Sequence, residues 1–157
     1  MHRSVRYWIT GVVAVCILVL AACGNPSEPM PIVDSGPELS LGVSTEDSSW
    51  FNTETMTAPA EQEVSLTFHN DSGLLRHNWV LVDGGDDVAT AVNAAGIEAG
   101  PAAEYLPESE QLVVATQLLD PGESATVTFT LPPGTYTFIC TFPGHYDQGM
   151  KGTLTVE

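Results

Sequence analysis

The chain has 157 residues, of which 20 are acidic and four are Lys or Arg, so its formal net charge is −16. This length suits one domain with a full hydrophobic core and is too short for two. An acidic surface of this strength excludes nucleic acid as a ligand, repels anionic lipid headgroups and favours basic protein partners, although acidity also serves solubility alone.

Residues 1–23 predict an export signal. Arg3 and Arg6 precede an uncharged, mostly apolar stretch from Trp8 to Ala22, which ends in small residues before Cys23. This order is typical of a secretory signal. Residues 20–23, Leu-Ala-Ala-Cys, resemble the lipobox of bacterial lipoproteins, in which the cysteine is acylated and becomes the new N-terminus. The alternative is an uncleaved anchor helix, although about 20 apolar residues are needed to span a bilayer. Both interpretations place the domain on the extracytoplasmic face, attached to the membrane.

Residues 24–38 are rich in Pro, Gly, Ser and acidic residues, which predicts a flexible linker. The folded domain is expected to span residues 39–157. All 20 acidic residues lie beyond Cys23, with only Arg76 and Lys151 among the basic ones, so the mature chain has a net charge near −18 when histidines are neutral.

Stretches that alternate apolar with small polar residues predict half-buried antiparallel β-strands in the domain. They are residues 39–43, 64–68, 126–131, 135–138 and 153–156. A further strand is expected from His77 to Val82. Turn sequences rich in Gly, Pro, Asn and Asp separate them, as at residues 70–73, 120–122 and 132–134. Short strands joined by such turns predict an all-β sandwich or barrel.

The segment between Asp83 and Leu119 departs from this pattern. It is rich in alanine, and a short helix is expected from Asp86 to Ala95, limited by Gly96 and by Gly100-Pro101. We interpret this segment as a short helical flap that is inserted between strands and covers one side of the barrel.

The strongest chemical signal is the string CTFPGHYDQGM, which runs from Cys140 through His145 to Met150 between two predicted strands. One loop therefore offers a thiolate, an imidazole and a thioether, and Pro143-Gly144 supplies its tight bend. His77, at the start of a strand, is a fourth candidate. Two imidazoles, one thiolate and a weak Met sulfur are the ligand set of electron-transfer copper sites. A structural zinc site usually has more thiolates or carboxylates.

Each of these residues, taken singly, has an ordinary structural explanation. A lone Met usually fills the core, a lone His is usually satisfied where it lies, and a lone buried Cys is usually inert. Cys140 is the one cysteine of the expected domain, and a lone cysteine makes no internal disulfide. A nucleophilic cysteine would need an adjacent base and an oxyanion hole, which nothing here suggests. The combination favours copper, while His69 is expected to be a surface histidine.

The segments CTFPGH, KGTLTV and HNWVL (residues 77–81) resemble blue copper proteins, or cupredoxins, of the azurin type. The spacing from His145 to Met150 and the alanine-rich flap look closer to the auracyanin type. The resemblance covers roughly residues 39–157 and implies a Greek-key β-barrel, with Asn78 bracing the ligand loop through a hydrogen bond. It also implies one copper ion, Cu(I)/Cu(II), with the ligands His77, Cys140, His145 and Met150.

Three features depart from azurin. Arg76 replaces the glycine that precedes azurin's first copper histidine, the distal disulfide is missing, and the spacing to Met150 is one residue longer. These differences concern a fifth contact and the reduction potential rather than the copper itself.

The expected function is therefore one-electron transport, with partners such as a cytochrome c or a membrane quinol-oxidising complex that dock near an exposed edge of His145. The alternative is a periplasmic copper-binding and delivery protein, which would favour exposed, exchangeable Met and His ligands. A multicopper enzyme would need a second centre bound mainly by histidines, and only His69 is left for it, so we do not expect an enzyme.

Overall fold

The structure, a computed structural model, describes residues 36–44 and 49–157. The predicted export signal and most of the predicted linker lie outside these residues. In the described part, no helix combines the length and the apolar character that crossing a bilayer requires.

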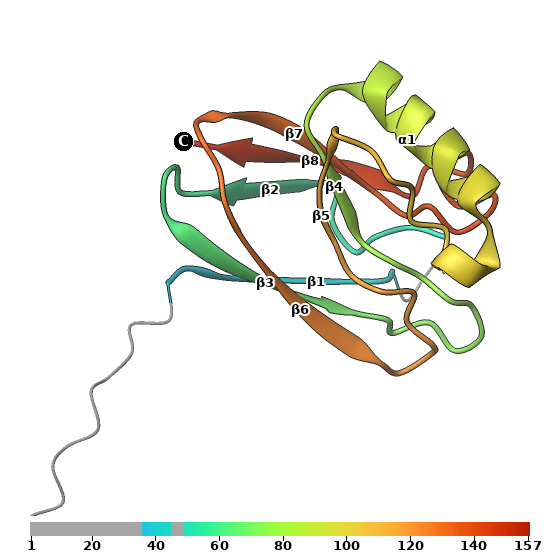
Figure 1. The fold of residues 1–157 in the computed structure, drawn as a ribbon. Helices are drawn as coiled ribbons and strands as arrows, with labels where there is room; N and C mark the ends of the chain where they lie inside the picture. Colours follow the sequence, from blue (N-terminus) through green and yellow to red (C-terminus); the bar gives the residue numbers. More distant parts are fainter. Residues whose placement is uncertain (1–35, 45–48) are drawn as a thin grey trace, which may run out of the picture. The chain divides into compact units, whose positions relative to one another are not determined.

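Two β-sheets, one α-helix and a short 3-10 helix form the described domain (Figure 1). The first sheet has the order β1-β3-β6, with β1 at Glu38–Gly42, β3 at Glu63–His69 and β6 at Ser124–Thr130. The second has the order β2-β8-β7-β4-β5, with β2 at Thr55–Ala58, β8 at Lys151–Val156, β7 at Gly134–Ile139, β4 at Val80–Val82 and β5 at Leu112–Ala115. The prediction of an all-β sandwich with a short helical flap is confirmed.

Strand pairing is mixed, because β1 pairs with β3 and β2 pairs with β8 in parallel. The prediction of antiparallel strands throughout was wrong for these pairs, since alternation of apolar and polar residues is the same in both orientations. The strands β2 and β5 were not predicted. Each has four residues, and all four positions of β5 are partly buried, so the sequence shows no clear alternation there.

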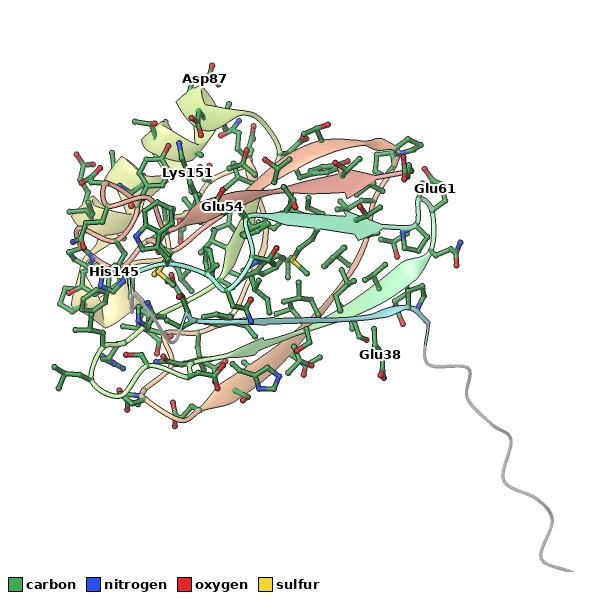
Figure 2. The ribbon with its side chains drawn as sticks, turned by 180° about the vertical axis from the view of Figure 1, so that it is seen from behind. Glu38, Glu54, Glu61, Asp87, His145 and Lys151 are labelled. Carbon is green, nitrogen blue, oxygen red and sulfur yellow. The ribbon has the colours of Figure 1, made fainter. Side chains whose placement is uncertain are left out.

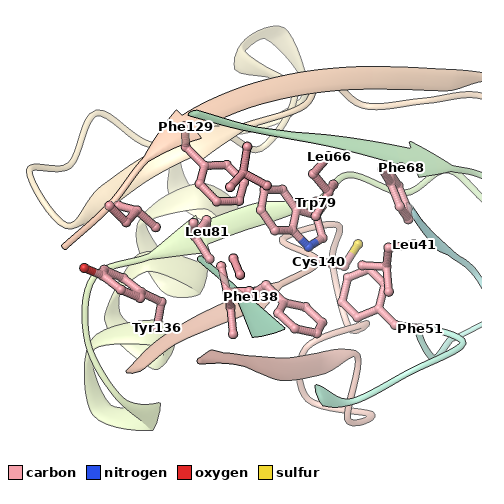
Figure 3. Close-up of a cluster of buried hydrophobic side chains, with 14 of the residues drawn as sticks. Leu41, Phe51, Leu66, Phe68, Trp79, Leu81, Phe129, Tyr136, Phe138 and Cys140 are labelled. Carbon is pink, nitrogen blue, oxygen red and sulfur yellow. The ribbon is translucent and has the colours of Figure 1, made fainter. Parts of the chain in front are cut away.

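The core lies between the two sheets and is rich in aromatic side chains (Figure 3). Trp79, just before β4, packs near Phe129 and Phe138, with 6.2 Å between ring centroids in each case. β4 is buried on both faces: Leu81 faces this core, whereas Val80 and Val82 belong to a second cluster beneath the helix. This double burial explains the continuous apolar run of β4.

The helix α1 spans Asp86–Ala99 and is followed by the short 3-10 helix η1 at Pro101–Ala103. Its buried residues Ala89 and Val92 cover the second sheet, as predicted for the flap. The predicted end at Ala95 was wrong, because the helix continues through Gly96. A Cβ at Gly96 would overlap the backbone oxygen of Tyr105 and lie 3.3 Å from Cβ of Thr141. Glycine therefore permits close packing here and does not end the helix.

The strand directions bring the predicted ligand residues to one end of the sandwich, which we call the ligand end. His77 bridges to Leu119, Cys140 directly follows β7, and Met150 directly precedes β8. Glu38, the first residue of β1, lies at the opposite end from His145 (Figure 2).

Candidate metal centre

Three predicted ligands converge at the ligand end. The donor atoms of His77, Cys140 and His145 all lie within 4.8 Å of one another, and within residues 36–44 and 49–157 this is the one group of such donors found. The Cys140 sulfur lies 3.9 Å from Nδ1 of His77 and 3.5 Å from Nδ1 of His145. Both imidazoles therefore turn the same nitrogen towards the thiol.

Met150 completes the group. Its thioether sulfur lies 3.2 Å from Nδ1 of His77, and its side chain is fully buried. Nε2 of His77 is buried without a partner among the described residues, so the polar contacts of this ring are made by Nδ1, towards the two sulfur atoms. The structure thus places all four predicted residues together, and their role as ligands remains a prediction.

The loop from Cys140 to Met150 is closed by its own backbone. Cys140 N–H donates to the Met150 carbonyl at 3.1 Å, and Met150 N–H donates to the His145 carbonyl at 2.9 Å. Gly144 has a φ of 86° and Gly149 a φ of 107°, a region that favours glycine. The backbone thereby links Met150 directly to the other two residues of the group.

Burial sets the protonation state of the metal-free site. It raises the pKa of the Cys140 thiol to about 12, although backbone N–H groups of Asn78 and Phe142 act against this rise. Burial, and then the neighbouring His145, lowers the pKa of His77 to about 4. Burial also lowers the pKa of His145. At neutral pH both imidazoles are neutral and can coordinate a metal, whereas the thiol must lose its proton when a metal binds.

The spacing of the donors fits a single metal ion. Metal–nitrogen and metal–sulfur bonds of about 2.0 and 2.3 Å, about 110–120° apart, separate the two donors by about 3.5–3.7 Å. The two observed sulfur–nitrogen distances, 3.5 and 3.9 Å, lie close to this range. With a thioether as fourth donor, the set matches copper better than zinc or a hard cation such as Mg²⁺.

Asn78 braces the ligand loop, as the resemblance implied. Its side-chain oxygen accepts a hydrogen bond from Thr141 N–H at 2.9 Å, and its amide nitrogen donates to Thr141 Oγ1 at 2.9 Å. The same nitrogen lies 3.4 Å from the Glu104 carbonyl oxygen in the flap. Asn78 and Thr141 are fully buried, so this amide fixes the residue after Cys140 with two reciprocal bonds.

The turn before His77 is also firmly held. Asn70 is fully buried, and its amide nitrogen donates to the carbonyl oxygens of Leu75 and Leu119 at 2.9 and 3.0 Å. Ser72 Oγ accepts a hydrogen bond from Leu75 N–H at 2.9 Å. Leu74, at the tip of this turn, is 83% exposed. An apolar side chain is thus displayed at the ligand end on a rigid turn.

Other expectations about the site differ in outcome. His69 lies outside the group and is half-buried, with its Nδ1 2.8 Å from Ser124 Oγ. No sequence pattern indicated that the hydroxyl of Tyr146, in the ligand loop, lies 2.9 Å from Thr90 Oγ1 in α1. These residues are 56 positions apart, and no periodic pattern pairs a helix residue with a loop residue at such a distance.

Known proteins resemble this chain in both sequence and structure. A family model described as copper-binding proteins of the plastocyanin/azurin family matches residues 37–157. The chain is 39% identical to Auracyanin-A of Chloroflexus aurantiacus over 164 residues, which cover 100% of both chains. It is 46% identical to Auracyanin-B of that organism over 129 residues, which cover 80% of this chain and 55% of the other.

A solved structure agrees with these sequence matches. The dithionite-reduced auracyanin of the photosynthetic bacterium Roseiflexus castenholzii superposes with a TM-score of 0.74 and 41% sequence identity. The match covers 78% of this chain and 98% of that one.

Proposed function

Because this chain belongs to the plastocyanin/azurin family of copper-binding proteins, we propose that it carries single electrons between redox proteins outside the cytoplasm on one copper ion. The resemblance seen in the sequence is confirmed by the family match and by the auracyanin relatives, and one-electron transport is the role that this resemblance implies. Within this function we assign the ion to His77, Cys140, His145 and Met150. The observation that carries this assignment is the convergence of these donors in one buried group.

Burial of the donors suits an electron carrier. His77, Cys140 and Met150 are fully buried, and His145 is 4% exposed. When bound, copper supplies the centre that accepts and releases one electron. The chain contributes a dry, closely packed site in which the side chains move little when the charge on the ion changes. A copper-delivery protein would instead need exposed, exchangeable ligands, so burial favours the carrier.

His145 offers the shortest route from the surface to the metal, because it is the one ligand in the group with measurable exposure. The half-buried Phe142 ring lies beside it, 4.8 Å between centroids, and Pro143 is exposed next in the chain. Leu74, on the turn before His77, is a further exposed apolar side chain. We call Phe142, Pro143 and Leu74 the apolar rim. We propose that partners such as a cytochrome c or a membrane quinol-oxidising complex dock on this rim.

We further propose that the chain is exported and attached to the membrane through a lipid on Cys23. The Leu-Ala-Ala-Cys string supports this attachment. The position of Glu38 supports a suitable orientation, because the chain enters the sandwich at the end opposite His145 (Figure 2). An N-terminal tether would leave the ligand end free to meet partners. Mass spectrometry of Cys23 tests the attachment, and an unmodified cysteine in an uncleaved chain would contradict it.

Metal binding is tested by loading the domain with copper in competition with zinc. We expect one copper per chain and, in the oxidised protein, an intense thiolate-to-copper absorption in the orange-red. Cys140→Ser should abolish this band, because the thiolate is its source. A colourless protein that holds zinc more tightly than copper would contradict the proposal.

Docking is tested by stopped-flow electron transfer with a basic cytochrome c over a series of ionic strengths. A net charge near −18 steers a basic partner over about 8 Å at physiological salt, so the rate should fall as salt rises. Asp147→Lys, in the ligand loop, should slow the reaction more than Glu38→Lys at the opposite end; both side chains are exposed. Equal effects would place docking elsewhere.

A further inference from the structure

Tyr146 differs from the other residues between the two ligands His145 and Met150. Asp147 and Gln148 are exposed and Gly149 has no side chain, whereas Tyr146 is buried to 9% exposure. Its carbonyl accepts a hydrogen bond from Gly149 N–H at 2.9 Å and thus closes the turn that leads to Met150. Tyr146 is therefore the one buried side chain among the residues between these two ligands.

The Tyr146 ring packs beneath helix α1 with Val80, Val82 and Ile139 of the second sheet. Its hydroxyl lies 2.9 Å from Thr90 Oγ1 and 3.3 Å from the Asp86 carbonyl oxygen. Thr90 Oγ1 donates its own proton to that carbonyl at 2.7 Å. The phenol is then left to donate to Thr90, and the three groups form a closed network between the loop and the helix.

The helix end that receives Tyr146 is itself fixed. Thr137 Oγ1 in β7 donates to the Gly84 carbonyl at 2.7 Å, two residues before α1 begins. Ala89 and Val92 are buried against the second sheet. A hydrogen bond from the loop to this helix therefore ties the loop to a rigid element rather than to a mobile one.

A second contact between loop and helix is weaker. Lys151, which follows Met150, has its Nζ 2.7 Å from Asp86 Oδ2 and 5.5 Å from the Tyr146 ring centroid. The side chains of this ion pair are 37% and 69% exposed, so solvent screens it and it contributes little. The ring of Tyr146 is buried and its hydrogen bond to the exposed Thr90 is half-buried, so this contact is the better shielded constraint of the two.

We propose that Tyr146 is a positioning residue for the copper site, which rests on the copper function proposed above. Its hydrogen bond to Thr90 holds the turn from His145 to Met150 against helix α1, and so fixes the two ligand side chains that this turn carries. A thioether would be the weakest donor of this set, so the packing of the chain would largely decide where the Met150 sulfur lies. Release of the turn then changes the metal's environment.

The test compares Tyr146→Phe with Tyr136→Phe in the copper-loaded protein. Both variants keep a buried ring and lose one hydroxyl group. Tyr136 is the control because its hydroxyl donates to the Pro132 carbonyl at 3.1 Å, far from the ligand loop. We expect Tyr146→Phe to shift the visible and electron paramagnetic resonance spectra of the oxidised protein and to weaken copper binding about tenfold in chelator competition. Tyr136→Phe should leave both unchanged.

Thr90 provides a second arm. Thr90→Val should reproduce the spectral shift, whereas Thr90→Ser, which keeps the hydroxyl, should retain the native spectrum. The double variant Thr90→Val with Tyr146→Phe should show little more change than either single variant. Additive effects, or a native spectrum in Thr90→Val, would overturn the proposal.

Amide hydrogen exchange of the metal-free proteins makes this test independent of copper. Loss of the Tyr146 hydroxyl in Tyr146→Phe should lower the protection of the Gly149 and Met150 amides about tenfold. Tyr136→Phe should leave this protection unchanged. A wild-type protein that fails to bind copper would overturn the proposed function, while this exchange comparison would still decide the role of Tyr146. Equal exchange and equal copper affinity in the two variants would show that Tyr146 is merely part of the core.

Discussion

Replacement of Asn78 by alanine should weaken both folding and copper binding. The change removes both hydrogen bonds to Thr141 and leaves its N–H and Oγ1 without these partners in a fully buried position. Each buried polar group left unpaired costs about 1–3 kcal/mol, so with two such groups the metal-free domain should lose about 2–6 kcal/mol of unfolding free energy. That is a large share of the roughly 5–15 kcal/mol that stabilises a typical domain.

The loss should be larger with copper bound. Loss of a side chain that orients metal ligands typically weakens metal binding about 10–100-fold, which removes about 1.4–2.7 kcal/mol of the stabilisation by copper. Urea unfolding of the metal-free and copper-loaded proteins measures both quantities. The midpoint of the metal-free variant should fall by about 1–3 M for an m-value of about 2 kcal/mol/M.

Asn93 in α1 is the matched control. It is also buried, but its side-chain oxygen has no partner in the described part of the chain. Asn93→Ala removes an unsatisfied group and improves helix propensity, so it should be neutral or stabilising. If Asn78→Ala cost no more than Asn93→Ala, or cost the same with and without copper, Asn78 would not brace the ligand loop.

Three further predictions follow from single residues. Gly149→Ala should lower the unfolding free energy, measured in urea, by at least about 1 kcal/mol more than Gly122→Ala. Both glycines have a positive φ, but only at Gly149 would a Cβ lie 2.7 Å from the Trp50 ring. Equal losses in the two variants would contradict this prediction. Met150→Leu should keep the visible band and raise the reduction potential in voltammetry, since loss of a weak axial donor disfavours Cu(II) more than Cu(I); an unchanged potential would show that Met150 is not axial. His77 has a pKa of about 4 when folded and 6.5 ordinarily, so between these values the unfolded chain binds more protons. The metal-free protein should therefore lose about 3 kcal/mol as pH falls from 6.5 to 4, and His77→Gln should flatten this slope.

Most strands that the sequence revealed have one face in the core and one towards solvent, whereas β4, which is buried on both faces, was revealed by its continuous apolar run. In β3 the burial alternates from Glu63 to His69, as the alternation of residue types predicted. In β5 all four positions are partly buried, and the residue types carry no such contrast. The orientation of β1 and β2 depends on the path of the connecting loops, which no strand sequence encodes.

The candidate site also combines features that the sequence revealed with features that depend on tertiary packing. Cys140, His145 and Met150 share one loop, so their spacing alone predicted a common site. His77 was predicted as a fourth ligand because it begins the strand from His77 to Val82 and because residues 77–81 resemble a cupredoxin segment. Contacts that depend on packing stayed hidden, such as the tie from Tyr146 to α1 and the close approach at Gly96 that lets the helix pass through a glycine.

The most direct test of an electron carrier is a redox titration of the copper-loaded domain followed by its visible absorption. We predict that the thiolate band bleaches on reduction and returns on oxidation in one reversible one-electron step, with the copper retained throughout. Release of copper from the reduced protein would contradict the account and favour a role in copper delivery.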